Sequence, residues 1–203
     1  MRIPTSFMGY RTCCCRTFNV GRATPVQHDV YRRAREWLDK AIELIKPGVS
    51  TDRVCSVWPR AEEFGFPDEM SAFGLQFGHG LGLALHERPI ISRVISLTHP
   101  TEIKEGMVFA LETYCPATDG YSAARIEEEV VVTDKGCRVI TLFPAEELPI
   151  SHRVLGSAAH AALSASSPSH SLAGRGAGGG GRFHILRLAE MFFLRDLSLQ
   201  AGS

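Results

Sequence analysis

The chain has 203 residues, of which 44% are hydrophobic and 22% are charged, as in a globular domain with a hydrophobic core. Lys plus Arg and Asp plus Glu both number 22, so the zero net charge gives no reason to expect nucleic acid or an anionic membrane as a partner. No apolar run of about 18 residues predicts a membrane span, and no charged-then-apolar leader is present, so a cytoplasmic location is expected.

The first half of the chain predicts a short strand and two helices. Residues 16–20 read as the end of a strand. Thr24 is typical of an N-cap and Pro25 of a first helical position, and apolar residues follow at helical spacing to Ile45. Pro47-Gly48 is expected to end this long amphipathic helix. A second helix, capped by Ser50 or Thr51 and containing Val54, Val57 and Trp58, is expected before Pro59.

The second half predicts strands from residue 71 onward. Four apolar segments carry the prediction: 73–85, 106–114, 123–133 and 137–143. The turn Asp134-Lys135-Gly136 joins the last two as a hairpin. Helices followed by antiparallel strands predict an α+β fold.

The C-terminal quarter differs in composition from the rest. We expect residues 1–150 to form one domain and 151–203 to lie outside it. Residues 165–182 are rich in Gly, Ser and Ala and are predicted to be disordered, and 183–197 could form a short helix.

Two histidines and two glutamates are the candidates for chemistry. His79 and His86 lie in the glycine-rich stretch GHGLGLALHERP, where each histidine alone would most simply be structural. Glu112 lies within the apolar segment VFALETY and Glu127 follows Ile126. A carboxylate in a buried strand is costly unless it is paired or binds a cation, so a divalent metal is a natural partner.

The run EEEVVV extends the acidic set. An alternating strand places Glu127 and Glu129 on one face and Glu128 on the other. A solvated acidic face is the alternative interpretation for Glu128 and Glu129.

Three segments in register, GHGLGLALHERP, EGMVFALET and RIEEEVVVTDKG, resemble the second half of the pita-bread metallopeptidases. That family includes methionine aminopeptidase, Xaa-Pro aminopeptidase, prolidase and the metal-free relative creatinase. GYRTCCCRTFNVG and IKPGVSTDRV also match, so the resemblance covers residues 9–145. It implies an incomplete pita-bread fold, a curved antiparallel sheet with flanking helices, and a hydrolase of the Xaa-Pro aminopeptidase or dipeptidase class.

The resemblance also implies roles for individual residues. His79, Glu112 and Glu127 match metal ligands, and Glu127 matches the ligand that bridges two ions. His86 faces the substrate and assists proton movement, so His86 and Glu127 are the implied catalytic residues. His79 and His86 are the implied substrate-binding residues.

Two aspartate ligands of the family have no counterpart here. Cys13 stands where the second belongs, the first would fall before Met1 or close to it, and no aspartate precedes Asp29. We therefore expect at most one divalent ion (Mn, Co, Zn or Fe), or none. The thiolate of Cys13 is an alternative fourth ligand.

Three functions remain open from the sequence. The first is a metallopeptidase-like hydrolase of short peptides, whose metal activates water. The second is a metal-free, creatinase-like hydrolase of a small C–N substrate. The third is a catalytically inactive binding module. A homodimer is compatible with each, and no nucleic acid or membrane partner is expected.

Overall fold

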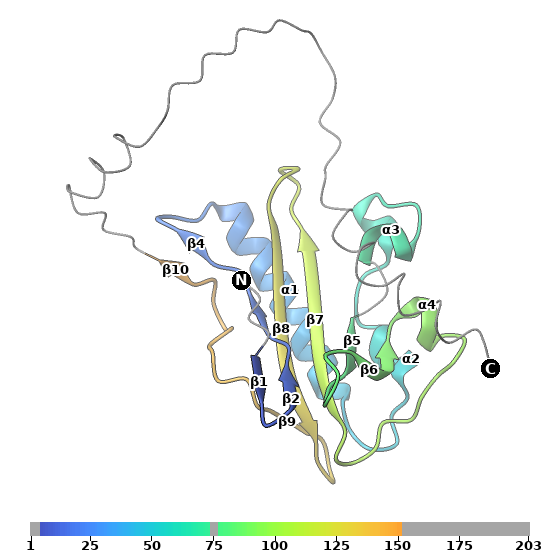
Figure 1. Cartoon of the computed structure of the whole chain (residues 1–203). Coiled ribbons are helices and arrows are strands. Elements are labelled where there is room, and N and C mark those ends of the chain that lie inside the picture. The colour runs from blue at the N-terminus through green and yellow to red at the C-terminus, as the bar shows by residue number, and fades with distance from the viewer. Residues whose placement is uncertain (1–4, 74–76, 152–203) are drawn as a thin grey trace, which may run out of the picture. The chain divides into compact units, whose positions relative to one another are not determined.

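The computed structural model describes residues 5–73 and 77–151 (Figure 1). Ser151 is the last described residue, so the predicted disorder of 165–182 and the predicted helix at 183–197 lie outside the described part. Within it, an antiparallel sheet and a set of helices form the α+β fold that the pattern of the sequence predicts.

The central element is a six-stranded sheet in which every pairing is antiparallel. Its strand order is β3-β8-β7-β5-β6, and β9 pairs with β8 next to β3. The strands are β3 (Cys15–Arg16), β5 (Gly78–Gly80), β6 (Glu87–Ile91), β7 (Val108–Pro116), β8 (Ala123–Val132) and β9 (Cys137–Val139). Two small pairs lie outside it: the hairpin of β1 (Thr5–Phe7) with β2 (Tyr10–Thr12), and the parallel pair of β4 (Asn19–Val20) with β10 (Ile150–Ser151).

The long predicted helix is α1 (Pro25–Leu44). Thr24 caps it as expected: its hydroxyl accepts from the Gln27 N–H while the Gln27 side chain accepts from the Thr24 N–H. The helix ends at Leu44, just before Pro47-Gly48. Four short helices follow: α2 (Thr51–Cys55), the 3-10 helix η1 (Ala61–Phe64), α3 (Glu69–Phe73) and α4 (Arg93–Ser96).

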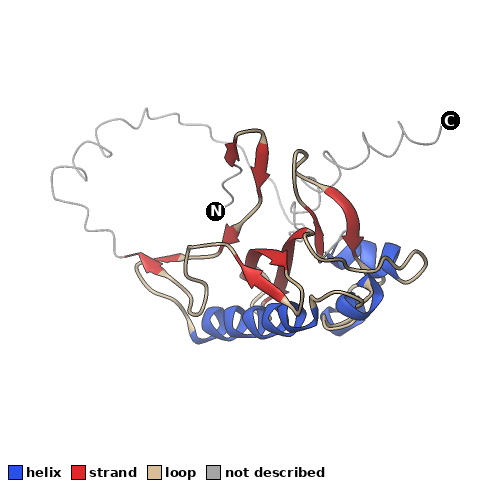
Figure 2. Ribbon diagram, turned by 90° about the horizontal axis from the view of Figure 1, so that it is seen from below, coloured by secondary structure: helices blue, strands red, loops and turns tan. Residues whose placement is uncertain are grey.

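The helices lie on one side of the sheet (Figure 2). Helix α1 contacts β7 and β8, the two longest strands. Because side chains alternate along a strand, every second residue of β7 and β8 reaches this helix. The main hydrophobic core forms there from Ala34, Leu38, Ala41, Phe109, Leu111, Ile126 and Val130, among others. The opposite face of the sheet carries polar side chains, among them His79, Glu112 and Glu127.

Several predicted boundaries are wrong in detail. The predicted second helix ends at Cys55, so Val57 and Trp58 follow it, although Trp58 is buried. The predicted strand at 137–143 ends at Val139, and Leu142 is 96% exposed. The predicted strand at 16–20 is divided between β3 and β4.

The predicted strand at 73–85 is a three-residue strand in its described part. The pairing of β5 with β6 changes register between His79 and Gly80, an irregularity of the β-bulge type. Residues 74–76 of this segment lie outside the described part.

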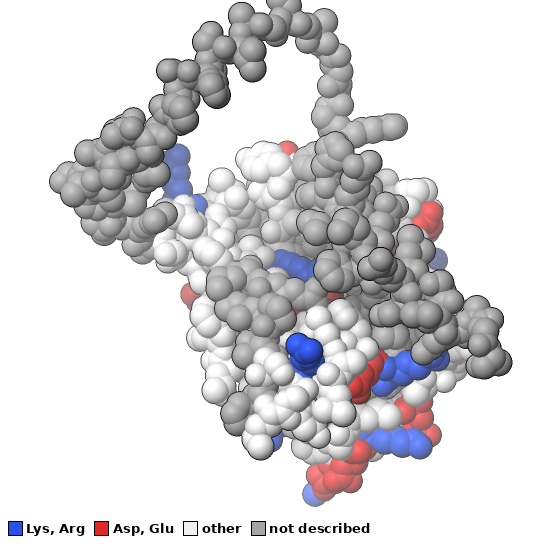
Figure 3. Space-filling view, in the orientation of Figure 1, with Lys and Arg blue, Asp and Glu red and all other residues white. Residues whose placement is uncertain are grey.

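No helix among residues 5–73 and 77–151 is long and apolar enough to cross a membrane. On the face drawn in Figure 3, acidic and basic side chains of the described residues lie next to one another, without a continuous patch of either sign. This mixed surface accords with the zero net charge.

Candidate metal centre

The strand register brings the predicted site residues to the face of the sheet opposite α1. Glu112 lies directly across from Glu127, and Ala110 lies across from both His79 and Glu129. Directly paired residues point to the same face, as do residues two apart on one strand. His79, Glu112, Glu127 and Glu129 therefore share one face.

His79 is fully buried and its tautomer follows from its contacts. Its Nδ1 lies 2.8 Å from the carbonyl oxygen of Gly80, which can only accept a hydrogen bond. In the neutral form of the ring, this contact places the proton on Nδ1 and a lone pair on Nε2. That Nε2 lies 3.2 Å from Glu112 Oε1, yet it has no hydrogen-bond partner among the described residues. A buried lone pair that faces a carboxylate is unfavourable, because both atoms are acceptors. A cation bound between them would interact with both.

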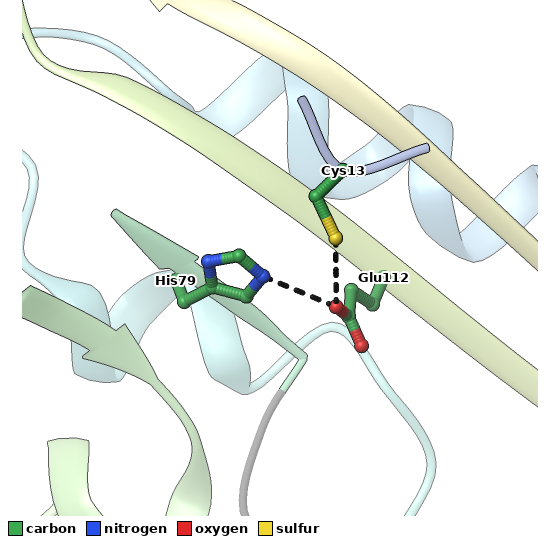
Figure 4. A group of neighbouring side chains, drawn as sticks. All are labelled: Cys13, His79 and Glu112. Carbon is green, nitrogen blue, oxygen red and sulfur yellow. Dashed lines mark hydrogen bonds and ion pairs between the residues drawn. The ribbon is translucent and has the colours of Figure 1, made fainter. Parts of the chain in front are cut away.

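Cys13 completes a group of three possible metal ligands, shown in Figure 4. It lies in the connection between β2 and β3 and is fully buried. Its Sγ lies 3.9 Å from Glu112 Oε1. One donor atom from each of Cys13, His79 and Glu112 lies within 4.8 Å of the other two. Donors bound tetrahedrally at ~2.0–2.3 Å are roughly 3.3–3.6 Å apart, so the group is close to the size that one zinc-like ion requires.

Glu127 lies beside this group and is fully buried. Its Oε2 is 3.6 Å from Cys13 Sγ, and its Oε1 accepts from Arg125 Nε at 2.7 Å. Arg125 also donates through Nη2 to Glu112 Oε2 at 2.5 Å. Each carboxylate thus directs one oxygen to Arg125 and the other toward Cys13.

Arg125 holds the two strands' carboxylates together. Burial disfavours the charged guanidinium, but Glu112 and Glu127 outweigh this and raise the pKa of Arg125 above its ordinary value. Arg125 precedes Glu127 by two residues on β8, so it lies on the same face. Arg125 is not among the residues predicted from the sequence, although its spacing of two residues from Glu127 in the predicted strand indicates the shared face.

Glu128 and Glu129 are buried, so the alternative of a solvated acidic face is wrong for both. Glu128 points to the opposite face from Glu127, as predicted, and pairs there with Arg16 at 2.9 Å and Arg35 at 3.0 Å. Glu129 accepts a hydrogen bond from the backbone N–H of Cys13. Burial raises the pKa of Glu129.

His86 lies next to His79, with ring centroids 4.2 Å apart and ring planes tilted by 50°. It is half-buried, whereas His79 has no exposed surface. It is not one of the three residues that could jointly hold an ion. A ligand from solvent can therefore contact the ring of His86 but not the fully buried ring of His79.

The chain is similar to known metallopeptidases. The model of metallopeptidase family M24 matches residues 3–134. The Xaa-Pro dipeptidase of Pyrococcus furiosus is 33% identical over 135 residues, which are 65% of this chain and 36% of that protein. The methionine aminopeptidase of Escherichia coli is 27% identical over 162 residues, 71% of this chain and 60% of that protein.

Solved structures agree with the sequence matches. Dipeptidase PepE from Mycobacterium ulcerans superposes with a TM-score of 0.60 at 27% identity, covering 73% of this chain and 38% of that one. The prolidase from Pyrococcus horikoshii gives 0.60 at 26% identity, covering 72% and 40%. The chain thus spans well under half the length of these dipeptidases. The sheet with helices on one side is accordingly part of a pita-bread fold, and the chain belongs to metallopeptidase family M24.

Proposed function

We propose that this chain is a metal-dependent peptidase of the Xaa-Pro dipeptidase or aminopeptidase type that uses a single divalent ion. The observation that carries the proposal is the buried Nε2 of His79, which has no hydrogen-bond partner in the described structure and faces Glu112 at 3.2 Å. Family membership supports the reaction class, and the similarity to Xaa-Pro dipeptidases supports the substrate class.

His79, Glu112 and Glu127 are the proposed protein ligands. A bound divalent ion polarises a scissile carbonyl and lowers the pKa of bound water. The residues must therefore present lone pairs in a site of fixed shape. The Nδ1 contact of His79 with Gly80 fixes its ring, and Arg125 fixes the outer oxygens of Glu112 and Glu127.

Two residues are proposed to move protons. Glu127 is the proposed base, because its Oε2 is directed into the site while Oε1 is held by Arg125. His86 is the proposed donor to the leaving amine, because its half-buried ring lies beside His79 but outside the ligand group. The proposed substrate is a short peptide with proline after the scissile bond, and the proposed location is the cytoplasm.

The experiment combines elemental analysis with peptide hydrolysis on the full chain. Protein stripped with a chelator is loaded with manganese, cobalt, zinc or iron, and hydrolysis of a proline-containing dipeptide is measured. We expect one ion per chain, hydrolysis only after loading, and loss of both in Glu112→Gln. The matched control is Glu105→Gln, because Glu105 is exposed and is not one of the proposed ligand residues. Two ions per wild-type chain would contradict the one-metal site.

A metal-free hydrolase of a small C–N substrate is the second candidate, and Arg125 is the observation that favours it. Its guanidinium already neutralises part of the charge of Glu112 and Glu127. Hydrolysis of an amidino substrate by chelator-treated protein, with no ion bound, would establish this candidate. If the protein neither bound a metal nor hydrolysed either substrate, the remaining candidate would be a catalytically inactive binding module.

A further inference from the structure

The strongest feature that the proposed function does not use is the buried thiol of Cys13. We propose that Cys13 is a thiolate ligand of the metal ion, together with His79 and Glu112, and that this sulfur makes the site selective for zinc over manganese. The inference rests on the proposed function, since it concerns the same ion, but it names a ligand and a metal preference that the aspartate-containing pattern would not give.

The position of Cys13 is fixed by its backbone. Its N–H donates to the carboxylate of Glu129. Two residues earlier, the N–H of Arg11 donates to the carbonyl oxygen of Gly82 at 2.8 Å, which ties the β2 end of the connection to the glycine-rich stretch. Both ends of this short segment are thus held by hydrogen bonds, and the Cys13 side chain lies against Glu112 of β7 and Glu127 of β8.

The atoms around Sγ are those of a metal site. Sγ lies 3.9 Å from Glu112 Oε1 and 3.6 Å from Glu127 Oε2. His79 adds the buried Nε2 lone pair, 3.2 Å from the same Glu112 oxygen. A thiol has one proton and can donate it to only one of these acceptors. An ion at the centre would satisfy the sulfur, the nitrogen and the carboxylate oxygens together.

A thiolate ligand would bring negative charge to the ion alongside the carboxylates of Glu112 and Glu127, whose outer oxygens are held by Arg125. Binding releases the thiol proton to solvent as the metal–sulfur bond forms, so the step needs no oxidant or reductant.

Sulfur changes which metal is preferred. Thiolate is a soft donor that suits zinc and cobalt, whereas carboxylate oxygen suits manganese and magnesium. Replacement of an aspartate ligand by cysteine should therefore move the preference of the site toward zinc.

The test is X-ray absorption spectroscopy on the zinc-loaded full chain, together with zinc and manganese affinities of variants. We expect a zinc–sulfur shell at about 2.3 Å besides nitrogen and oxygen at about 2.0–2.1 Å. Cobalt-loaded protein should show sulfur-to-cobalt charge-transfer absorption. In Cys13→Ser both signals disappear, and zinc affinity falls by more than the roughly 10–100-fold that loss of an outer-shell partner costs.

Cys13→Asp and Cys14→Ser sharpen the result. Cys13→Asp should lower the ratio of zinc to manganese affinity by at least about tenfold. Cys14→Ser should change neither spectrum nor ratio, because Cys14 is only half-buried and outside the ligand group. The wild-type spectra need no variant, so a misfolded variant would not prevent the test.

The outcomes separate the two proposals. Zinc bound only by nitrogen and oxygen, with an unchanged ratio in Cys13→Asp, would overturn the thiolate ligand. If Glu112→Gln still abolished binding in that case, the one-metal peptidase would stand. Binding of manganese or iron without binding of zinc or cobalt would overturn the thiolate ligand alone. If wild-type protein bound none of the four metals, both proposals would fail.

Discussion

Gly80→Ala should destabilise the protein and displace His79 from the site. A Cβ atom at position 80 would lie 2.5 Å from the carbonyl oxygen of Arg88 and 3.0 Å from that of Glu87. Carbon and oxygen in close contact are ordinarily ~3.3–3.6 Å apart, so β5 and β6 must separate by roughly 0.8–1 Å. Both neighbours are backbone atoms, so no side-chain rotation relieves the contact.

The magnitude follows from two opposing effects. Overpacking typically costs about 1–3 kcal/mol, and a clash with backbone belongs at the upper end. Alanine also lowers the entropy of the unfolded chain, which offsets about 0.4–1 kcal/mol. The net loss is roughly 2 kcal/mol, which for a chain of this size lowers the Tm by about 4–8 °C. Because the carbonyl of Gly80 orients His79, the zinc affinity should fall as well.

Gly82→Ala is the matched control. The nearest atoms that a Cβ there would meet belong to the carboxylate of Glu87, the first at 2.9 Å, and that side chain can rotate away. Rotation forfeits the hydrogen bond that Glu87 accepts from the N–H of Ala84, worth about 1 kcal/mol, which the alanine entropy effect largely offsets. Thermal unfolding and zinc titration of both variants provide the measurement. Equal changes in Gly80→Ala and Gly82→Ala would refute the backbone argument.

Three further substitutions test other parts of the structure. Glu128→Ala should lower the free energy of unfolding, measured in urea, by about 3–5 kcal/mol, because the buried guanidinium of Arg16 loses its carboxylate partner. Exposed Glu36→Ala should cost under about 1 kcal/mol, and similar losses in the two variants would argue against a buried ion cluster. His86→Ala should lower turnover about 10²–10⁴-fold and leave the zinc content unchanged. Substitution of the exposed His99 by alanine should alter neither quantity, and loss of zinc in His86→Ala would make His86 a ligand. Thr24→Ala should cost about 0.5–2 kcal/mol through the lost cap of α1, and Thr24→Ser should restore most of it; an unchanged Tm in the alanine variant would contradict the capping role.

The sequence predicted the elements whose local signals are strong. Helix α1 has a capping residue, a proline in its first turn and a continuous apolar stripe, and it begins at Pro25 as expected. The hairpin of β8 and β9 follows from its tight turn, and the side-chain alternation of β8 follows from its strand pattern. Glu112 stood out because its neighbours are apolar, and it is in fact 5% exposed.

The parts that the sequence did not predict depend on register between distant strands. The contact of Arg125 with both Glu112 and Glu127 exists because β7 and β8 pair with these glutamates directly opposite one another. A shift by one residue would place Arg125 and Glu127 on the other face. The burial of Glu128 likewise depends on Arg16 and Arg35, which come from β3 and α1. Neither partner can be inferred from the run EEEVVV alone.

Arg125 also bears on how many ions the site can hold, independently of the missing aspartates. A carboxylate that bridges two ions with one oxygen on each needs both oxygens free, yet Oε1 of Glu127 and Oε2 of Glu112 are engaged by the guanidinium. Only one oxygen of each remains directed toward Cys13. A second divalent ion would have to displace Arg125 and would then meet a positive charge nearby. The arginine and the cysteine therefore favour the same arrangement, in which one ion is held between His79, Glu112 and a sulfur.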